Sequence, residues 1–268
     1  MEADYIDDAE QKPRFCSLSL PRNEGRRLGR RPSFTLCGTM PAMEITWYGD
    51  SCLRLKGREG VVAADAYRSV VGPTGRGLTA DIVTYSHPDD APPPARGKAA
   101  GLNGHAAGLL RPTSLDPAFI LDGPGEFEVH EVLINGVRTF RDDEKGKQRG
   151  LNTCFVYELD GLHVVHLGDI GHLLDEDGLG DIGSVDVVCV PIGSSLTAAK
   201  AAEVATQVDA RLIVPMLIGE GEAARSALER FMHEMSVQHP TPVPRLSVTI
   251  STVPSETTVV VLESRTRV

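Results

Sequence analysis

Two loops of this chain carry the side chains best suited to chemistry. The first, residues 81–90, begins with a β-branched run and ends with His87 and Asp89 among other polar residues. The second, residues 162–172, follows an apolar run and contains Asp169. A buried strand fixes the backbone of such a loop, and the loop presents the side chains. Because imidazole and carboxylate groups are metal ligands, the question is whether the two loops meet around a metal.

Several short stretches occur together, in an order that resembles the metallo-β-lactamase superfamily. The resemblance is greatest to its branch of metal-dependent (Zn-dependent) hydrolases related to L-ascorbate 6-phosphate lactonase, and it runs over most of residues 43–262. The matching stretches are residues 47–53, 80–84, 123–128, 149–153, 166–172 and 213–216. The resemblance implies an α/β fold, a four-layer αββα sandwich, with the site at one edge where loops from both halves meet.

The first ligand loop of the family has the pattern His-x-His-x-Asp-His. Aligned on its Pro-Asp pair, this chain has Tyr85, His87, Asp89 and Asp90 at those four positions. An alignment with a two-residue deletion makes His87 the first histidine instead. In both alignments one histidine remains of three.

Two later ligand positions of the family are also substituted. Where the family has a histidine after a Thr-Tyr/Phe pair, this chain has Arg141, and the last family histidine falls on Leu217. The aspartate that bridges metals in the family is present as Asp169. The resemblance therefore implies a residual metal set of His87, Asp89, Asp90 and Asp169, with Asp89 and Asp169 as the catalytic candidates.

These substitutions change what the site can hold. Leu217 cannot coordinate a cation, Arg141 brings a permanent positive charge, and Tyr85 would have to ionise before it could ligate. The remaining oxygen donors suit magnesium, calcium or manganese better than zinc. We therefore expect one divalent metal (Zn, Mn or Mg) at most, bound weakly or not at all. Our hypothesis is that Arg141 takes the place of the metal by pairing with a neighbouring carboxylate of Asp89, Asp90 or Asp169.

Two further residues are candidates for supporting contacts. Ser86 precedes His87, and His172 follows Asp169 by three residues. For His172 a capping or packing role is an equal alternative. Ser86 is also the nearest nucleophile to His87 in the sequence, if His87 acts as a general base without a metal.

Two functions are compatible with this pattern. In the first, the chain keeps the hydrolase fold as a binding or assembly module and is catalytically impaired or non-catalytic. In the second, it is an active metal-dependent hydrolase of an ester, lactone or phosphoester that uses the reduced His/Asp set. The number of lost ligands favours the first.

The elements that must position these residues follow from the periodicity of apolar residues. Early strands, then strand-helix repeats, predict two sheets packed face to face with helices outside. Strands are expected over residues 45–48, 52–55, 61–64, 82–84, 119–121, 127–134, 153–158, 162–167, 185–190, 212–214, 246–250 and 258–262. Helices are expected over residues 197–208 and 222–235.

Composition and chain organisation narrow the remaining choices. We expect residues 1–42 to be a disordered or mis-assigned extension, because they show no sustained periodicity, and residues 43–268 to form the domain. A net charge of −10 disfavours nucleic acid, and the sequence has no apolar run long enough for a membrane. Five scattered cysteines indicate a reducing, cytoplasmic location. A small-molecule ligand and a homo-oligomer remain compatible with the sequence.

Overall fold

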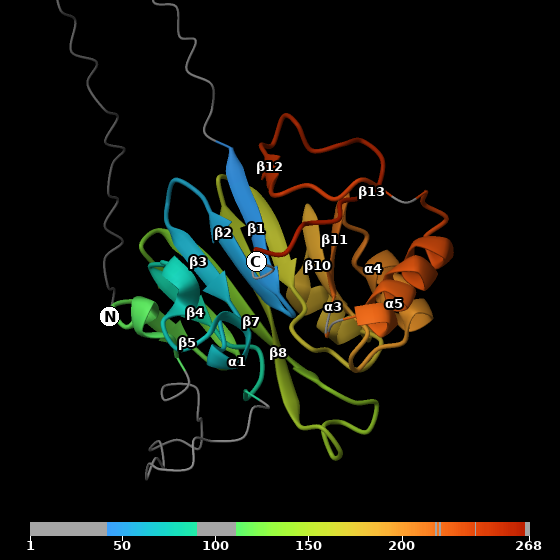
Figure 1. The fold of residues 1–268 in the computed structure, drawn as a ribbon, viewed down its shortest axis with the longest axis horizontal. Coiled ribbons are helices and arrows are strands. Elements are labelled where there is room, and N and C mark those ends of the chain that lie inside the picture. Colours follow the sequence, from blue (N-terminus) through green and yellow to red (C-terminus); the bar gives the residue numbers. More distant parts are fainter. Residues whose placement is uncertain (1–41, 90–110, 218, 220, 239, 266–268) are drawn as a thin grey trace, which may run out of the picture. The chain divides into compact units, whose positions relative to one another are not determined.

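Two β-sheets form the centre of the structure, a computed structural model that describes residues 42–89, 111–217, 219, 221–238 and 240–265 (Figure 1). The strands of the first sheet are β1 (Met43–Gly49), β2 (Cys52–Lys56), β3 (Val61–Ala64), β4 (Ile82–Thr84), β5 (Phe119–Leu121) and β12 (Leu246–Val248), in the order β12-β1-β2-β3-β4-β5. The strands of the second are β6 (Gly125–Val129), β7 (Val132–Phe140), β8 (Leu151–Leu159), β9 (Leu162–His166), β10 (Val187–Ile192), β11 (Leu212–Leu217) and β13 (Thr258–Val259), in the order β13-β11-β10-β9-β8-β7-β6.

Helices lie on the outer faces of the sheets. The second sheet is covered by α4 (Ala198–Val208) and α5 (Gly221–Glu234), with α3 (Glu176–Ile182) against β7. Among the described residues, α1 (Arg68–Val71) and two short 3-10 turns, Gly75–Gly77 and Thr113–Leu115, pack on the first sheet. The predicted αββα sandwich is confirmed.

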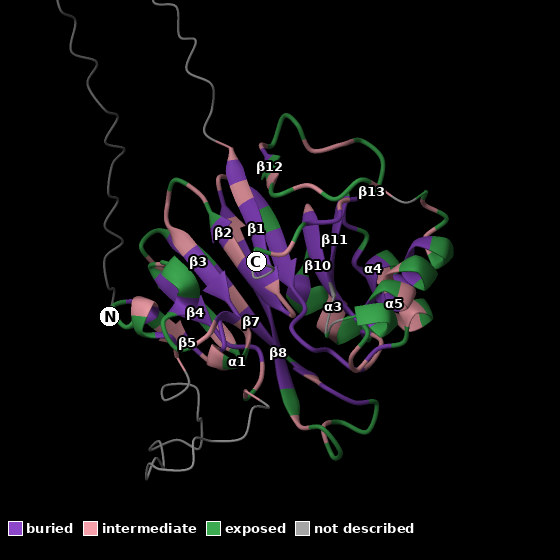
Figure 2. Cartoon of the chain, viewed as in Figure 1, coloured by how far each residue is buried: buried purple, intermediate pink, exposed green. Residues whose placement is uncertain are grey.

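Each interface between layers has its own apolar core. Ile45 and Leu55 of the first sheet meet Phe155 of the second between the sheets, all fully buried. Val188 and Phe231 belong to the core beneath α4 and α5. Figure 2 shows the strands as buried and the outward faces of the helices as exposed. Because burying each such side chain contributes about 1.5–3 kcal/mol, these layers fix the strands on which the site is built.

The strand directions bring the loops of interest to one edge. In the first sheet β1, β3 and β4 run the same way, because β2 is antiparallel to both β1 and β3 and β4 is parallel to β3. In the second sheet β8 is antiparallel to β7 and β9, and β10 is parallel to β9. Polar residues that follow the ends of these strands can therefore gather at one edge of the sandwich.

Most of the predicted elements are present. Helix α4 begins after Thr197, whose hydroxyl accepts the backbone N–H of Lys200, and its apolar face includes Val204 and Val208. The hairpin turn at Asp160 also lies where it was predicted, with Asp160 in the left-handed region (φ 52°).

One prediction for the middle of the chain was wrong, and one helix was not predicted. Residues 127–134 were expected as one strand but form parts of the β6–β7 hairpin, which turns at His130 and Glu131 with φ of 53° and 66°. Neither residue is the glycine or asparagine that normally indicates such a turn. Helix α3 was not expected, because it contains two glycines; Asp175 caps it by accepting the N–H of Gly178.

We expect Gly171→Ala to destabilise the protein by about 1–3 kcal/mol, because a Cβ at Gly171 would overlap the backbone carbonyl of Arg141. The control is Gly180→Ala in α3, where a Cβ meets nothing within 4 Å; it should leave stability unchanged or raise it by about 0.5–1 kcal/mol. Urea unfolding of both variants measures the difference. Equal effects would show that the contact between residues 141 and 171 is not tight.

Candidate functional site

A small polar pocket of about 200 Å³ lies where the loops after the strands of both sheets meet. Its wall includes three carboxylates, an imidazole and a guanidinium, from Asp50, Asp89, Asp169, His87 and Arg141. The rest of the lining consists of Val70, Tyr67 and the serines Ser51, Ser69 and Ser194. The two loops that the sequence analysis singled out therefore do meet, with Arg141 beside them.

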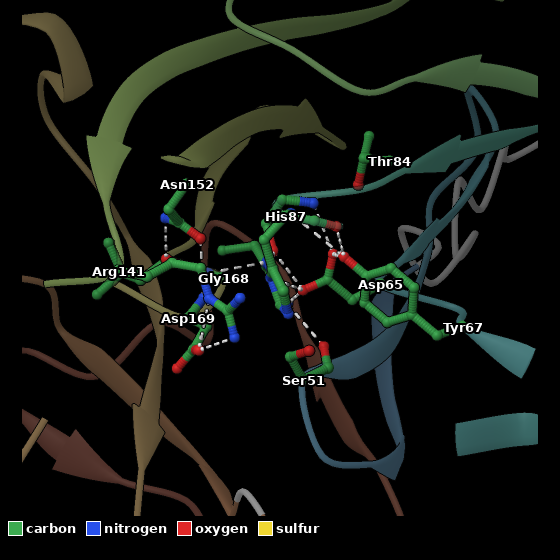
Figure 3. A network of polar contacts seen from close by, with 12 residues as sticks. Ser51, Asp65, Tyr67, Thr84, His87, Arg141, Asn152, Gly168 and Asp169 are labelled. Carbon is green, nitrogen blue, oxygen red and sulfur yellow. Dashed lines mark hydrogen bonds and ion pairs between the residues drawn. The ribbon is translucent and has the colours of Figure 1, made fainter. Parts of the chain in front are cut away.

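The most buried charges in the pocket wall belong to Arg141 and Asp169, which are 5% and 3% exposed. Arg141 Nε and Nη2 lie 2.9 and 2.8 Å from Asp169 Oδ2 (Figure 3). Ser195 Oγ donates to the other oxygen, Oδ1, at 2.9 Å. Both oxygens of the carboxylate thus accept hydrogen bonds from protein groups, and the guanidinium balances its charge.

The backbone beneath Asp169 is held by Asn152 and Gly168. Asn152 Oδ1 accepts the N–H of Asp169 at 2.9 Å, and Asn152 Nδ2 donates to the carbonyl of Leu167 at 2.9 Å. Gly168 has φ of 64°, and a Cβ there would overlap the side chain of Ser86. Glycine is required at position 168 because the two halves of the fold touch at this point.

Arg141 stands at the start of a closed loop, residues 141–150. The Asp142 carboxylate accepts backbone N–H groups of Glu144, Gly146, Gln148 and Arg149. These donors, Arg149 first, lower the pKa of Asp142, against the opposing effect of burial. The loop brings Arg149 Nη2 to 3.4 Å from Asp169 Oδ2. The sequence analysis did not identify Asp142, because its acceptor role depends on the folded loop.

A second polar network lies on the side of the first sheet and centres on Asp65, which is fully buried. Its carboxylate accepts the N–H of Ser86 at 2.7 Å and the Ser86 hydroxyl at 2.6 Å, and the Tyr67 hydroxyl oxygen lies 3.2 Å away. Burial, and then the charge of Asp65, raise the pKa of Tyr67, which keeps the phenol protonated. The sequence carried a signal for Asp65, which directly follows a strand expected to end at residue 64.

The same network orients His87. Since Ser86 Oγ has one hydrogen and gives it to Asp65, it accepts from His87 Nδ1, 2.7 Å away. The ring proton of a neutral His87 therefore lies on Nδ1. The Tyr67 hydroxyl donates to the carbonyl of His87, which fixes the backbone as well. In Figure 3, His87 is drawn between the Asp65 network and the Arg141–Asp169 pair.

The other residues of the first loop lie in different surroundings. Asp89 lines the pocket and accepts the Ser69 hydroxyl at 2.9 Å. Tyr85 lies in the outer core of the first sheet, where its ring packs against Tyr67, and burial raises its pKa. Tyr85 is thus a neutral core residue. Asp90 lies outside the described residues, and Leu217 is described only as the last residue of β11, where it pairs with Ile192.

The two supporting candidates make backbone contacts. His172 Nε2 accepts the N–H of Phe140 at 3.1 Å, and Nδ1 lies 2.7 Å from the carbonyl of Leu173. His172 therefore holds the strand end next to Arg141, which is the packing alternative considered above. Ser86 is 3% exposed and donates to Asp65, so it is not placed as a nucleophile.

Comparisons with known proteins agree with this fold. The family described as the beta-lactamase superfamily domain matches residues 44–217. A metal-dependent hydrolase of the UPF0173 group from Methanoculleus marisnigri is 27% identical over 199 residues, 70% of this chain and 87% of that protein. Its counterpart from Methanoregula boonei is 26% identical over 208 residues, 70% of this chain and 90% of that protein.

Solved structures with the same fold include proteins of this superfamily. A metallo-beta-lactamase superfamily protein from Thermotoga maritima has 29% sequence identity and a TM-score of 0.61, with 83% of this chain and 100% of that chain covered. Igni18, a metallo hydrolase from Ignicoccus hospitalis, has 15% identity and a TM-score of 0.52 over 77% of this chain and 97% of its own, which shows the fold alone. The two-sheet sandwich and the family match together identify the class of protein. The chain belongs to the beta-lactamase superfamily.

We expect Arg141→Gln and Asp169→Asn each to destabilise the protein by about 3–5 kcal/mol, because each leaves its buried partner without its opposite charge. The double variant should lose less than the sum, by at least about 1 kcal/mol. Denaturant unfolding measures the cycle. The exposed pair Arg225 and Glu222 is the matched control and should couple by less than about 0.5 kcal/mol. Additive losses at Arg141 and Asp169 would contradict the ion pair.

The lowered pKa of Asp142 predicts a pH dependence. A carboxylate whose folded pKa is lowered adds stability that is present above its unfolded pKa and is lost as the pH falls through the folded pKa. Asp142→Asn should therefore be less stable than the wild type at neutral pH, and the gap should narrow as the pH falls below about 4. Urea unfolding between pH 3 and pH 7 checks this. A gap that stays constant would contradict the role of the ionised carboxylate.

Proposed function

We propose that this chain is a non-hydrolytic member of its superfamily, whose pocket binds a small polar ligand with Arg141 in the place of a metal cation. The observation that carries the proposal is the pair of short contacts from Arg141 Nε and Nη2 to Asp169 Oδ2. A fixed guanidinium already supplies the positive charge that the buried carboxylate requires. The resemblance noted above aligns these two residues with two metal ligands of the family.

The side chains that remain do not fit a divalent metal. Both oxygens of Asp169 accept hydrogen bonds from protein donors, and Asp89 Oδ1 accepts from Ser69. The part of the chain that the structure describes contains no group of three or more His, Cys, Asp or Glu side chains arranged to hold a metal ion. A cation at Asp169 would also meet the charge of Arg141 at close range.

Without a metal, the pocket lacks the usual source of an activated water in this superfamily. A guanidinium does not lower the pKa of a bound water as a zinc ion does, because it has no coordination site to offer. The described residues offer no replacement nucleophile at Ser86, which is buried and occupied. Binding without hydrolysis is the function that these side chains support best.

An active metal-dependent hydrolase is the second candidate. It is favoured by the relatives, two of which carry the name metal-dependent hydrolase. Such an activity would rest on His87, Asp89 and Asp169, with Asp90 outside the described residues. It would require Arg141 to leave Asp169. An ester, lactone or phosphoester would be the substrate class.

We propose a cytoplasmic location for this function. Cys52, Cys154 and Cys189 are buried and free, and burial raises the pKa of each thiol, so that they stay protonated and inert. Among the described helices, none has the length and apolar character needed to cross a membrane.

Metal analysis separates the two candidates. The protein is purified with added zinc or manganese and then desalted. We expect elemental mass spectrometry to find well below one metal ion per chain. The Methanoculleus marisnigri relative, treated in parallel, controls for loss of metal during desalting. Stoichiometric metal that disappears in Asp169→Asn would overturn the non-hydrolytic proposal and favour the hydrolase.

A further inference from the structure

Among the described residues, the side chains in contact with Asp169, at one end of the pocket, carry more positive than negative charge. Two guanidiniums, from Arg141 and Arg149, converge on one carboxylate. Arg141 makes the two short contacts, whereas Arg149 Nη2 is 3.4 Å away, longer than an ordinary N–H···O hydrogen bond. The side chain of Arg149 is 40% exposed. Asp169 therefore neutralises the buried arginine and leaves the charge of the exposed one only loosely balanced.

The backbone that carries Arg149 is fixed in advance. Its N–H donates to Asp142 Oδ2 at 2.6 Å, in the set of four backbone donors that closes the loop. The carbonyl of the next residue, Gly150, accepts the N–H of Arg141 at 3.1 Å. The base of the Arg149 side chain is thus held beside the pocket, and a ligand need not order the loop.

A hydroxyl stands next to this guanidinium. Ser194 Oγ lies 3.3 Å from Arg149 Nη2 and belongs to the wall of the pocket. A guanidinium and a hydroxyl side by side match the donors that a carboxylate or phosphate group accepts. The neighbouring Ser195 is already used on Asp169, so Ser194 is the hydroxyl placed for a ligand.

The rest of the pocket limits what the ligand can be. Asp50 and Asp89 belong to the same wall and repel a second anionic group. These carboxylates accept hydrogen bonds from hydroxyl or amino groups. With a volume of about 200 Å³, the pocket is smaller than the range of about 300–1,000 Å³ that is usual for drug-sized ligands.

We propose that Arg149 and Ser194 bind the one oxyanion group, carboxylate or phosphate, of a small ligand whose other end carries hydrogen-bond donors. This inference rests on the proposed metal-free pocket. Arg141 and Asp169, which also line the pocket, act as positioning residues, since their pairing leaves the charge of Arg149 only loosely balanced.

The test is calorimetric titration of the full chain with acetate and, separately, with inorganic phosphate at constant ionic strength. The protein is first treated with chelator. We expect at least one probe to bind, Arg149→Gln to weaken binding about 10-fold, and Ser194→Ala to weaken it by a smaller factor. Which probe binds distinguishes a carboxylate from a phosphate ligand. The fluorescence of Trp47, the single tryptophan, gives a second readout, because its indole N–H donates to the carbonyl of Asp50 in the pocket wall.

The control is Arg211→Gln, which removes the same charge from an exposed residue immediately before β11 and should bind as the wild type does. Unfolding midpoints of the variants check that the fold is retained. Absence of binding by both probes, or equal loss in the Arg149 and Arg211 variants, would overturn the oxyanion site while leaving the metal question to elemental analysis. Binding that appears only after zinc or manganese is added would instead overturn the proposed metal-free function, and the oxyanion site with it.

Discussion

The buried charge of Asp169 is the constraint on which the candidate site depends. A carboxylate that is 3% exposed must be paired, and here Arg141 and Ser195 supply the partners. Neighbouring contacts hold both partners of this ion pair in place. Asn152 holds the backbone of Asp169, and His172 accepts the N–H next to Arg141. Both oxygens of the buried Asp169 carboxylate therefore have partners within the protein.

A second set of contacts joins the two sheets behind the pocket. Ser86 is the centre of this junction, because its carbonyl accepts the N–H of Thr153 at 2.7 Å and its side chain touches Gly168. His166 Nε2 lies 2.7 Å from the carbonyl of Ser51, and its Nδ1 accepts the N–H of Gly168. None of these contacts requires a bound cation. The pocket walls are therefore positioned by the fold itself.

The sequence predicted the frame of the site better than its details. The strand ends before His87 and Asp169 could be placed because β-branched runs stop there, and the resemblance paired these loops with Arg141. Asp142 was not foreseen, since its role depends on a loop that returns four backbone donors to one carboxylate. The turn at His130 was missed because nothing in its residue types requires a left-handed backbone. Local sequence patterns predict helices and strands. Hydrogen-bond donors that converge on one group from separate residues can be identified only in the folded chain.

The proposed exchange of a metal for a guanidinium would separate two properties of such a site, charge balance and water activation. A guanidinium, like a metal ion, supplies a positive charge that can neutralise a buried carboxylate. Only a metal offers an open coordination position at which water becomes a nucleophile. A guanidinium instead offers directional N–H donors, which recognise planar or tetrahedral oxyanions. Under this proposal the scaffold keeps a binding pocket without the metal chemistry, because fold and chemistry are set by different residues.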